Sequence, residues 1–289
     1  MQTPLSGIQD LEARPAEPSD RKGLHLGSPW EHMRIENQDE PWGSVLDAGT
    51  GEQSLGWLVE QESSSWTAVT ACSKRMNGLR RTFAQKMRRE DRLVLGTWSD
   101  PHLLSGEVYD TVIAQYLLGA IERFDPYQEH RLFRRLRPLV GRQLFVVGLQ
   151  PMNSPSNSEE LLILRLLNYR DVAFVHDDAR HYREYPLRWV QQNLLDSGFE
   201  IRQTRCFQNL IGKKFANGLI DSGQSRAESF WDQQFAQDFK RHGERLGEEA
   251  HQALKAGPLH GGYDYLISAS PKDVTPRQPR RTNVRFNKT

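Results

Sequence analysis

The chain has 289 residues, enough for one large α/β domain or two domains of about 150 residues each. Its 38 basic and 37 acidic residues leave a formal net charge of +1, so there is no global attraction to nucleic acid or an anionic membrane. Cys72 and Cys206 are the only cysteines, which excludes a disulfide framework and a four-thiolate metal site. No uncharged apolar run approaches the ~20 residues of a spanning helix, and the start lacks a secretory pattern. We therefore expect a cytoplasmic protein.

Both ends of the chain have the composition of flexible segments. Residues 1–40 are rich in Pro, Glu, Asp, Gln and Ser, and such a segment buries too little apolar surface to offset its ordering entropy. Within it we expect a short helix over 30–35, anchored by Trp30 and Met33. Residues 276–289 carry five basic residues and no acid, which is typical of a solvated, disordered basic tail. A tether to nucleic acid or membrane is the alternative for this tail.

Strand-like and helix-like segments alternate in the first part of the intervening region, 41–275. Five apolar runs are typical of buried strands: 44–48, 66–71, 93–96, 109–114 and 143–148. Three stretches have helical spacing: 55–60, 74–87 and 132–136. This alternation predicts a mostly parallel sheet that is covered on both faces. Ligands of such sheets bind beyond the carboxyl ends of the strands, where the strand order reverses.

The pattern changes after residue 150. Helical spacing covers 159–167 and 186–195, and β-rich runs at 199–204 and 263–269 predict two further strands. Between these runs, 209–259 shows no clear strand, and the apolar residues from Phe230 to Leu254 have helical spacing. We expect that helix to pack on the domain, with a lid over a substrate and a dimer contact as alternatives.

The most informative segment is 45–52, Val-Leu-Asp-Ala-Gly-Thr-Gly-Glu. An apolar strand leads into Asp47, then into a turn with Gly49 and Gly51, and then into a helix. The glycines allow a tight turn and close approach of the backbone to a ligand, and the first N–H groups of the helix can bind an anionic group. A dinucleotide site would need Gly-x-Gly-x-x-Gly, but Ser54 occupies the third glycine position. The pattern argues against a nicotinamide enzyme.

This segment resembles the first motif of the class I S-adenosylmethionine-dependent methyltransferases, in which an apolar strand, an acid, a small residue and Gly-x-Gly follow one another. The resemblance covers about 43–150, where Tyr109-Asp110 is similar to the start of that family's fourth strand and 134–147 to its passage into the fifth. Residues 197–201 resemble the approach to its sixth strand. It implies an α/β fold with a seven-stranded, mostly parallel sheet and helices on both faces. Residues 151–198 and 207–262 would be helical insertions that form a substrate lid.

The resemblance also implies where the cofactor, S-adenosyl-L-methionine, would bind. The first motif contributes Asp47, Gly49, Thr50, Gly51 and Glu52. The end of the second strand and the following helix contribute Ala71, Cys72 and Met76. The ends of the third and fourth strands contribute Thr97, Trp98 and Gln115. The family usually has a ribose-binding acid near Ala71, and this sequence has none; Thr70, Ser73, a backbone group or Glu52 are the open alternatives.

The methyl acceptor has to be aligned with the methyl group and the sulfur, shielded from water and, where necessary, relieved of a proton. Tyr116, which follows the fourth strand, is the candidate catalytic residue. The sequence lacks Asn/Asp-Pro-Pro-Tyr at this point, which argues against an enzyme that methylates DNA bases or glutamine. Candidate substrate-binding residues are Tyr127, Tyr182, Tyr185 and Asn217. We expect no metal site.

We therefore expect methyl transfer to an O, N or S atom of a small molecule, by direct displacement in a pocket that the insertions close. A protein or RNA methyltransferase guided by the basic tail is one alternative. A non-catalytic, cofactor-binding scaffold is another, because a decayed site would lack the acid near Ala71. The expected partner is a small-molecule acceptor, without membrane or nucleic acid, and a homodimer remains open.

Overall fold

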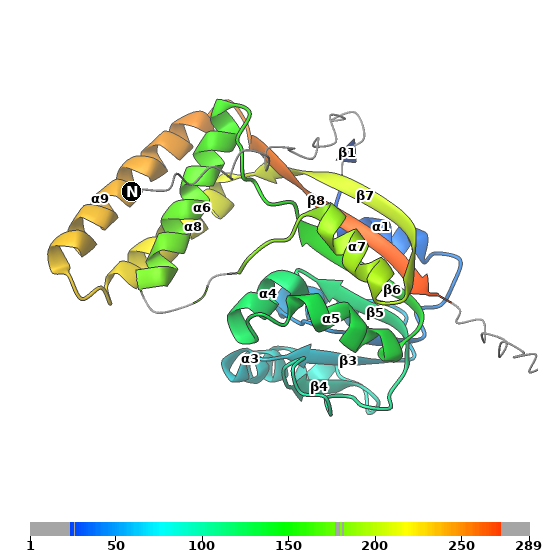
Figure 1. Cartoon of the computed structure of the whole chain (residues 1–289). Helices are drawn as coiled ribbons and strands as arrows, with labels where there is room; N and C mark the ends of the chain where they lie inside the picture. Colours follow the sequence, from blue (N-terminus) through cyan, green and yellow to red (C-terminus); the bar gives the residue numbers. More distant parts are fainter. Residues whose placement is uncertain (1–23, 26, 177–179, 181, 273–289) are drawn as a thin grey trace, which may run out of the picture.

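The computed structural model describes residues 24–25, 27–176, 180 and 182–272. Within these ranges it has a sheet of eight strands (Figure 1). The strands are β1 (Leu24–His25), β2 (Ser44–Asp47), β3 (Ser65–Thr70), β4 (Arg92–Leu95), β5 (Tyr109–Gln115), β6 (Val140–Leu149), β7 (Phe199–Ile211) and β8 (Leu259–Pro271). Of the segment 1–40 for which we expect flexibility, residues 1–23 lie outside the described residues, as does the basic tail 276–289.

The strand order is β1-β7-β8-β6-β5-β2-β3-β4. Neighbouring strands are parallel, except that β8 runs antiparallel to both β6 and β7. The predicted α/β fold with a mostly parallel sheet is confirmed, and all seven predicted strands are present. The eighth strand, β1, has two residues that pair with Cys206 and Phe207 at the edge of β7. So short a run carries no periodicity that a sequence could reveal.

Nine α-helices accompany the sheet in the described ranges. They are α1 (Pro29–Glu36), α2 (Glu52–Leu58), α3 (Ser73–Phe83), α4 (Leu117–Phe124), α5 (Glu129–Leu136), α6 (Ser158–His176), α7 (Leu187–Asp196), α8 (Lys213–Ala227) and α9 (Gln233–Ala253). The helix α1 corresponds to the one predicted over 30–35. It begins where the Ser28 side chain accepts a hydrogen bond from the Glu31 amide, with Pro29 in the first turn. None of the described helices is long and apolar enough to cross a membrane.

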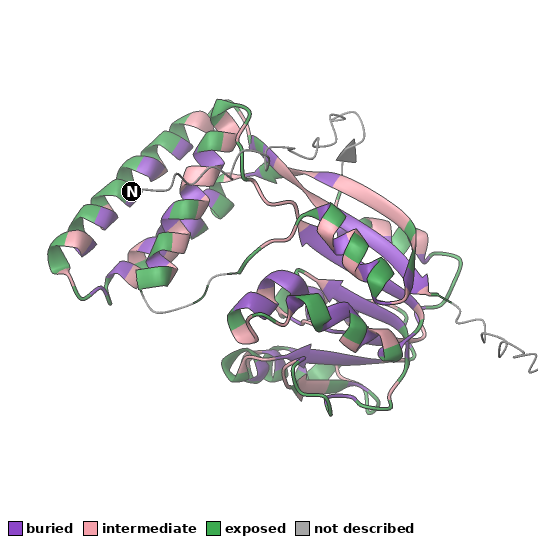
Figure 2. Cartoon of the chain, viewed as in Figure 1, coloured by how far each residue is buried: buried purple, intermediate pink, exposed green. Residues whose placement is uncertain are grey.

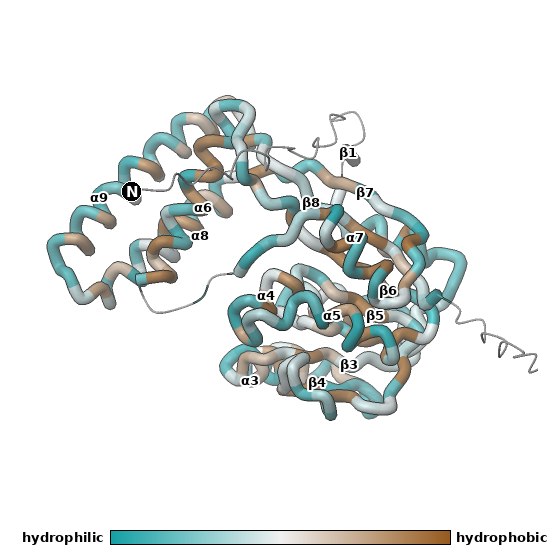
Figure 3. The backbone as a smooth tube through the Cα atoms, in the orientation of Figure 1, coloured by the Kyte–Doolittle hydropathy of each residue, from teal (hydrophilic) through white to brown (hydrophobic). Residues whose placement is uncertain are grey.

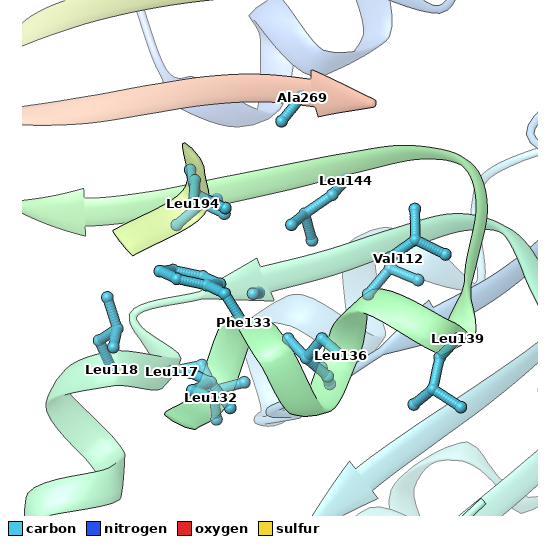
Figure 4. Packing of buried hydrophobic residues seen from close by; sticks show 14 of the residues in the cluster. Val112, Leu117, Leu118, Leu132, Phe133, Leu136, Leu139, Leu144, Leu194 and Ala269 are labelled. Atoms are coloured by element: carbon cyan, nitrogen blue, oxygen red, sulfur yellow. The ribbon is translucent and has the colours of Figure 1, made fainter. Parts of the chain in front are cut away.

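Two buried clusters cover the two faces of the sheet. On one face, α4, α5 and α7 pack against β5 and β6, with Phe133 and Leu144 completely buried between them (Figure 4). On the other face, α1, α2 and α3 bury Met33, Leu55 and Leu79 against the same sheet. Because both faces are covered, the central strands are nearly continuous buried runs (Figure 2).

Helices α6, α8 and α9 form a separate bundle beyond the carboxyl ends of β6 and β7 (Figure 1). Figure 3 shows hydrophobic and hydrophilic positions alternating along these helices, as expected of helices that bury one face. The bundle has its own core, in which the ring of Tyr169 stacks on Phe239 at a centroid distance of 4.2 Å. The helix predicted around Phe230–Leu254 is thus α9, and it packs within this bundle rather than directly on the sheet.

The structure corrects the boundaries of the predicted insertions. The stretch 209–259, predicted to lack strands, contains the end of β7 and the start of β8, because Leu210 pairs with His260 and Ile211 with Leu259. The helix α7, which lies within the predicted insertion 151–198, instead buries Val190 and Leu194 in the core beside α5. The segment that leaves the sheet between β6 and α7 is therefore shorter than predicted.

Replacing Gly243 in α9 tests how tightly the bundle is packed. A Cβ atom at this position would overlap the hydroxyl and ring of Tyr169, which is 3% exposed and held by its stacking on Phe239. We expect Gly243→Ala to lower the free energy of unfolding by about 1–3 kcal/mol, measured by urea denaturation followed by circular dichroism. The control is Gly218→Ala in α8, where a Cβ meets nothing within 4 Å, and a gain of about 0.4–1 kcal/mol is expected. Equal effects of the two changes would contradict this packing.

Candidate functional site

A cleft opens at the carboxyl ends of β2, β3 and β4, beside the point where the strand order reverses between β2 and β5. It consists of two adjoining pockets, and both are lined by Gly49, Arg75 and Ala120. The first pocket extends to the ends of β3 and β4 and to α4. The second extends along α2 and α3 to the end of β5, and its volume is about 570 Å³, within the usual range for ligand sites of about 300–1,000 Å³.

The loop of the first motif is held by backbone hydrogen bonds to both neighbouring strands. The Ala48 amide donates to the Ile113 carbonyl at 2.8 Å, and the Thr50 amide donates to the Val69 carbonyl at 2.7 Å. Gly51 caps α2, and its amide donates to Ser54 Oγ at 2.8 Å. Ser54, the residue that breaks the dinucleotide pattern, therefore shapes this turn.

Asp47 ends β2 and is 1% exposed. Its Oδ1 accepts a hydrogen bond from the Gly49 amide at 3.4 Å, whereas Oδ2 has no hydrogen-bond partner among the described residues. Burial raises the pKa of Asp47, and the hydroxyls of Thr50 and Ser54 oppose that rise. A buried carboxyl oxygen without a full set of partners costs folding free energy, and such groups occur often at functional sites.

The segment that follows β4 holds this loop by a hydrogen bond from Trp98. The indole Nε1 of Trp98 donates to the Ala48 carbonyl at 2.7 Å, and the ring is 7% exposed. Trp98 and Thr97 both line the first pocket, as does Asp125 after α4, which accepts a hydrogen bond from the Ser99 amide at 2.7 Å. Trp98 thus has a structural role in bracing the motif loop. Asp125 was not among the predicted residues, since an acid in a Phe-Asp-Pro turn has no distinguishing spacing.

The end of β3 departs most from the expected pattern. Ala71 lines the first pocket. Cys72 caps α3 by accepting a hydrogen bond from the Arg75 amide, and Met76 lies on the buried face of α3. Neither Cys72 nor Met76 lines the cleft. The charged side chain that reaches the cleft from α3 is Arg75, which the sequence did not single out because α3 carries four basic residues without a distinctive pattern. A guanidinium only donates hydrogen bonds, so it cannot replace an acid that accepts them from ribose hydroxyls.

Tyr116 stands at the end of β5 as the N-terminal cap residue of α4, in the left-handed conformation with φ of 47°. This conformation is uncommon outside glycine and is often found at functional sites. The side chain is 37% exposed and lines the second pocket with Gln115 and Glu52. Burial, followed by the carboxyl groups of Asp264 and Glu184, raises the pKa of Tyr116 far above its ordinary value. The hydroxyl therefore stays protonated and acts as a hydrogen-bond donor at neutral pH.

Two carboxyl groups lie beside Tyr116. Asp264 in β8 pairs in register with Leu149 of β6, and its Oδ1 accepts a hydrogen bond from Asn209 at 3.3 Å. Glu184 comes from the loop before α7 and packs on Gly119 of α4. Burial, followed by the charge of Asp264, raises the pKa of Glu184 to about 7. The sequence analysis did not identify this pair as a site, because Asp264 is an isolated acid within an apolar strand.

Of the four predicted substrate-binding residues, the structure brings only Tyr182 to the cleft, where it lines the second pocket. Tyr127 is 69% exposed and lies under the guanidinium of Arg180. Tyr185 packs on Trp189, and Asn217 bonds to His251 within the bundle at 2.6 Å. No group of three or more His, Cys, Asp or Glu side chains in the described ranges is placed to hold a metal ion.

No protein-family model matches this sequence, and no curated protein matches it either. Several solved structures have a similar fold. A methyltransferase-like protein of Bacillus halodurans matches with a TM-score of 0.55 and 13% identity, over 85% of this chain and 99% of its own. A cyclopropane-fatty-acyl-phospholipid synthase-like protein of Lactobacillus casei matches with a TM-score of 0.56 and 11% identity, over 84% and 89% of the two chains. The mycolic acid cyclopropane synthase CmaA1, complexed with SAH and CTAB, matches with a TM-score of 0.51 and 14% identity, over 84% and 83%. These likenesses show that the chain has the α/β fold of the class I methyltransferases.

Proposed function

We propose that this protein is an S-adenosyl-L-methionine-dependent methyltransferase that acts on a small molecule. The observation that carries the proposal is the motif loop Asp47-Ala-Gly49-Thr-Gly51, which opens into a cleft at the switch point of the sheet. The same cleft leads to Tyr116, which adjoins two carboxyl groups suited to acid–base chemistry. The size of the second pocket suits a small acceptor better than a macromolecule.

The residues that line the cleft fit this cofactor. The backbone of Gly49 and Gly51 suits its ammonium end, and Arg75 suits its carboxylate. Asp47 lines neither pocket, but its unpartnered oxygen is buried directly before this loop. The apolar walls of the first pocket, Leu117, Ile121 and Phe124, suit a purine, with Asp125 as a polar partner at the rim. Glu52 in the second pocket is a carboxylate that can accept hydrogen bonds from ribose hydroxyls.

When bound, the cofactor supplies a methyl group on a positively charged sulfur. The chain's own contribution is to bind, orient and shield the reactants. Glu52 lines the second pocket together with Arg75, and the carboxyl groups of Glu184 and Asp264 act on Tyr116 at its edge. Carboxylates at such a site stabilise a positively charged ligand. The bundle of α6, α8 and α9 lies beyond the carboxyl ends of β6 and β7, and none of the residues that line the two pockets belongs to it (Figure 1).

A non-catalytic cofactor-binding protein is the second candidate. The observation that favours it is the absence of an acid after β3, where Ala71 and Cys72 stand and Arg75 is the nearest charged group that lines the cleft. Such a protein would bind S-adenosylmethionine but would not transfer its methyl group to any acceptor.

Calorimetric titration with S-adenosylmethionine and S-adenosylhomocysteine tests the cofactor assignment, with NAD as the negative control. We expect micromolar binding of the first two ligands only. Gly49→Ala should weaken both by at least about tenfold, since its Cβ would lie 2.8 Å from Leu117 Cδ1 and push this side chain within the first pocket. Gly218→Ala, remote from the cleft, is the matched control. Unchanged affinity of the Gly49→Ala protein would show that the cofactor binds elsewhere.

Asp47→Asn should have opposite effects on the stability of the fold and on the affinity for S-adenosylmethionine. Because the pKa of Asp47 is raised on folding, the folded protein loses stability relative to the unfolded chain as the pH rises above the unfolded carboxyl pKa. The variant lacks this loss, so its urea midpoint relative to that of the wild type should rise as the pH increases above the ordinary range of an aspartate pKa. Its affinity for S-adenosylmethionine should fall at least about tenfold with the loss of the charged hydrogen bond. A variant that is less stable at neutral pH and binds normally would refute both roles of Asp47.

A further inference from the structure

A second hollow lies at the opposite end of the sheet from the cleft. It opens between α1, the loop that leads from α1 into β2, and the end of α2, and its volume is about 750 Å³. The residues that line it precede β2 and β3, so it lies at the amino ends of these strands, whereas the cleft lies at their carboxyl ends. We call this hollow the α1–α2 groove.

The α1–α2 groove has an aromatic and apolar wall. Trp57 near the end of α2 lies edge-to-face with Trp42 at a centroid distance of 5.4 Å, and its other neighbour is Trp30 at 4.8 Å. Trp42 is buried and Trp57 is half-buried, and Ile35 of α1, which also lines the groove, is 50% exposed. The ring of Trp57 is therefore held in place by the core while part of it stays accessible. Such a ring attracts a guanidinium or ammonium group.

Carboxylates give the same groove a negative charge. Five carboxyl groups line it, against one cation, Arg34. One of the five, Glu40, is ion-paired with Arg142 of β6. The other four are exposed and have no ion-pair partner among the described residues: Glu31, Asp39, Glu60 and Glu62. Carboxylates around an accessible indole ring match a ligand that is basic and contains arginine.

The described part of the chain ends close to this groove. The strand β8 ends at Pro271 and lies antiparallel beside β6. Near the start of β6, Arg142 binds the groove wall, because its guanidinium pairs with Glu40 and donates to the Pro41 carbonyl at 2.6 Å. The helix α1 also contacts β8 directly (Figure 1). The segment that follows β8 thus starts one strand away from the groove wall.

That segment has the complementary chemistry. Residues 276–289 contain five basic residues, no acid, and the apolar side chains of Val284 and Phe286. The start of the segment is fixed, since the Lys272 carbonyl accepts a hydrogen bond from Arg137 at 3.1 Å. The first arginine, Arg277, follows Lys272 by five residues. At about 3.4 Å per residue it can lie up to about 17 Å away, and the end of the segment up to about 55 Å away.

We propose that the α1–α2 groove binds the chain's own basic segment 276–289. The arginines of the segment pair with the four carboxylates that lack ion-pair partners and stack on Trp57. Attachment gives the segment an effective concentration on the order of 1 mM at the groove, so a free peptide with a Kd of about 100 µM would, when attached, be docked about ten times as often as undocked. This contact is independent of the proposed function, since the groove and the cleft lie at opposite ends of the strands.

Limited proteolysis of the full chain tests this contact. Trypsin cleaves after arginine, and the rate of cleavage after Arg281 follows the undocked fraction of the segment. The wild type is compared with Glu60→Gln/Glu62→Gln, which removes two of the four carboxylates, and with Glu244→Gln/Glu248→Gln, a matched control on the exposed face of α9. All four residues are exposed, so neither pair of changes should disturb folding. Mass spectrometry measures each rate relative to that of the free peptide 276–289 in the same solution.

In about 20 mM salt we expect cleavage of the wild type to be about tenfold slower than that of the free peptide. Glu60→Gln/Glu62→Gln should raise the rate at least about threefold, and the α9 control should leave it unchanged. In about 1 M salt the Debye length falls to about 3 Å, so the protection should largely disappear. Wild-type cleavage as fast as that of the free peptide, or equal effects of the two pairs of substitutions, would overturn the proposal. Protection that grows with protein concentration would also overturn it, because the segment would then bind another copy of the chain.

Discussion

The antiparallel strand β8 is the element on which the rest of the arrangement depends. It pairs with β6 on one side and with β7 on the other, and β7 and β8 are both 13 residues long. Because of this length the two strands reach past the sheet and carry α8 and α9 between them. The same strand places Asp264 opposite Leu149 and anchors the loop before α7 through the Tyr265 hydroxyl. Gly148 leaves the space for that tyrosine, since a Cβ there would overlap its ring.

The cleft concentrates features that each cost folding free energy. Asp47 is buried without a full set of hydrogen bonds, Tyr116 has a left-handed backbone, and Glu184 and Asp264 keep two carboxyl groups close together. Features of this kind persist only where the surrounding structure fixes them. Here the surrounding structure consists of the two buried clusters on the faces of the sheet, which extend to the cleft itself through Trp98, Leu117 and Leu79.

The sequence was sufficient for the parts of the molecule that follow hydrophobic periodicity or a local motif. The strands β2 to β6 are apolar runs, and the turn at Gly49 and Gly51 is defined within a few residues. It was insufficient where the position of a side chain depends on pairing between distant segments. Asp264 and Glu184 are 80 residues apart, and they approach one another only because β8 lies beside β6 while the loop before α7 rests on α4. The prediction that Cys72 and Met76 bind the cofactor was wrong for a local reason. Cys72 caps α3 and Met76 is a buried residue of that helix, and such residues have the same spacing from the strand as ligand-binding residues.

The two-residue strand β1 has a consequence for how the molecule behaves toward its own copies. An edge strand of 13 residues such as β7 offers a row of unpaired backbone groups on which another chain can add. In the described part of the chain, β1 pairs only with Cys206 and Phe207, so it interrupts that row near the middle. Arg202 and Arg205 add charge to the same strand. The short strand β1 thus limits the addition of another chain at this edge of the sheet. Protection against edge-to-edge association therefore depends on residues that take no part in the cleft.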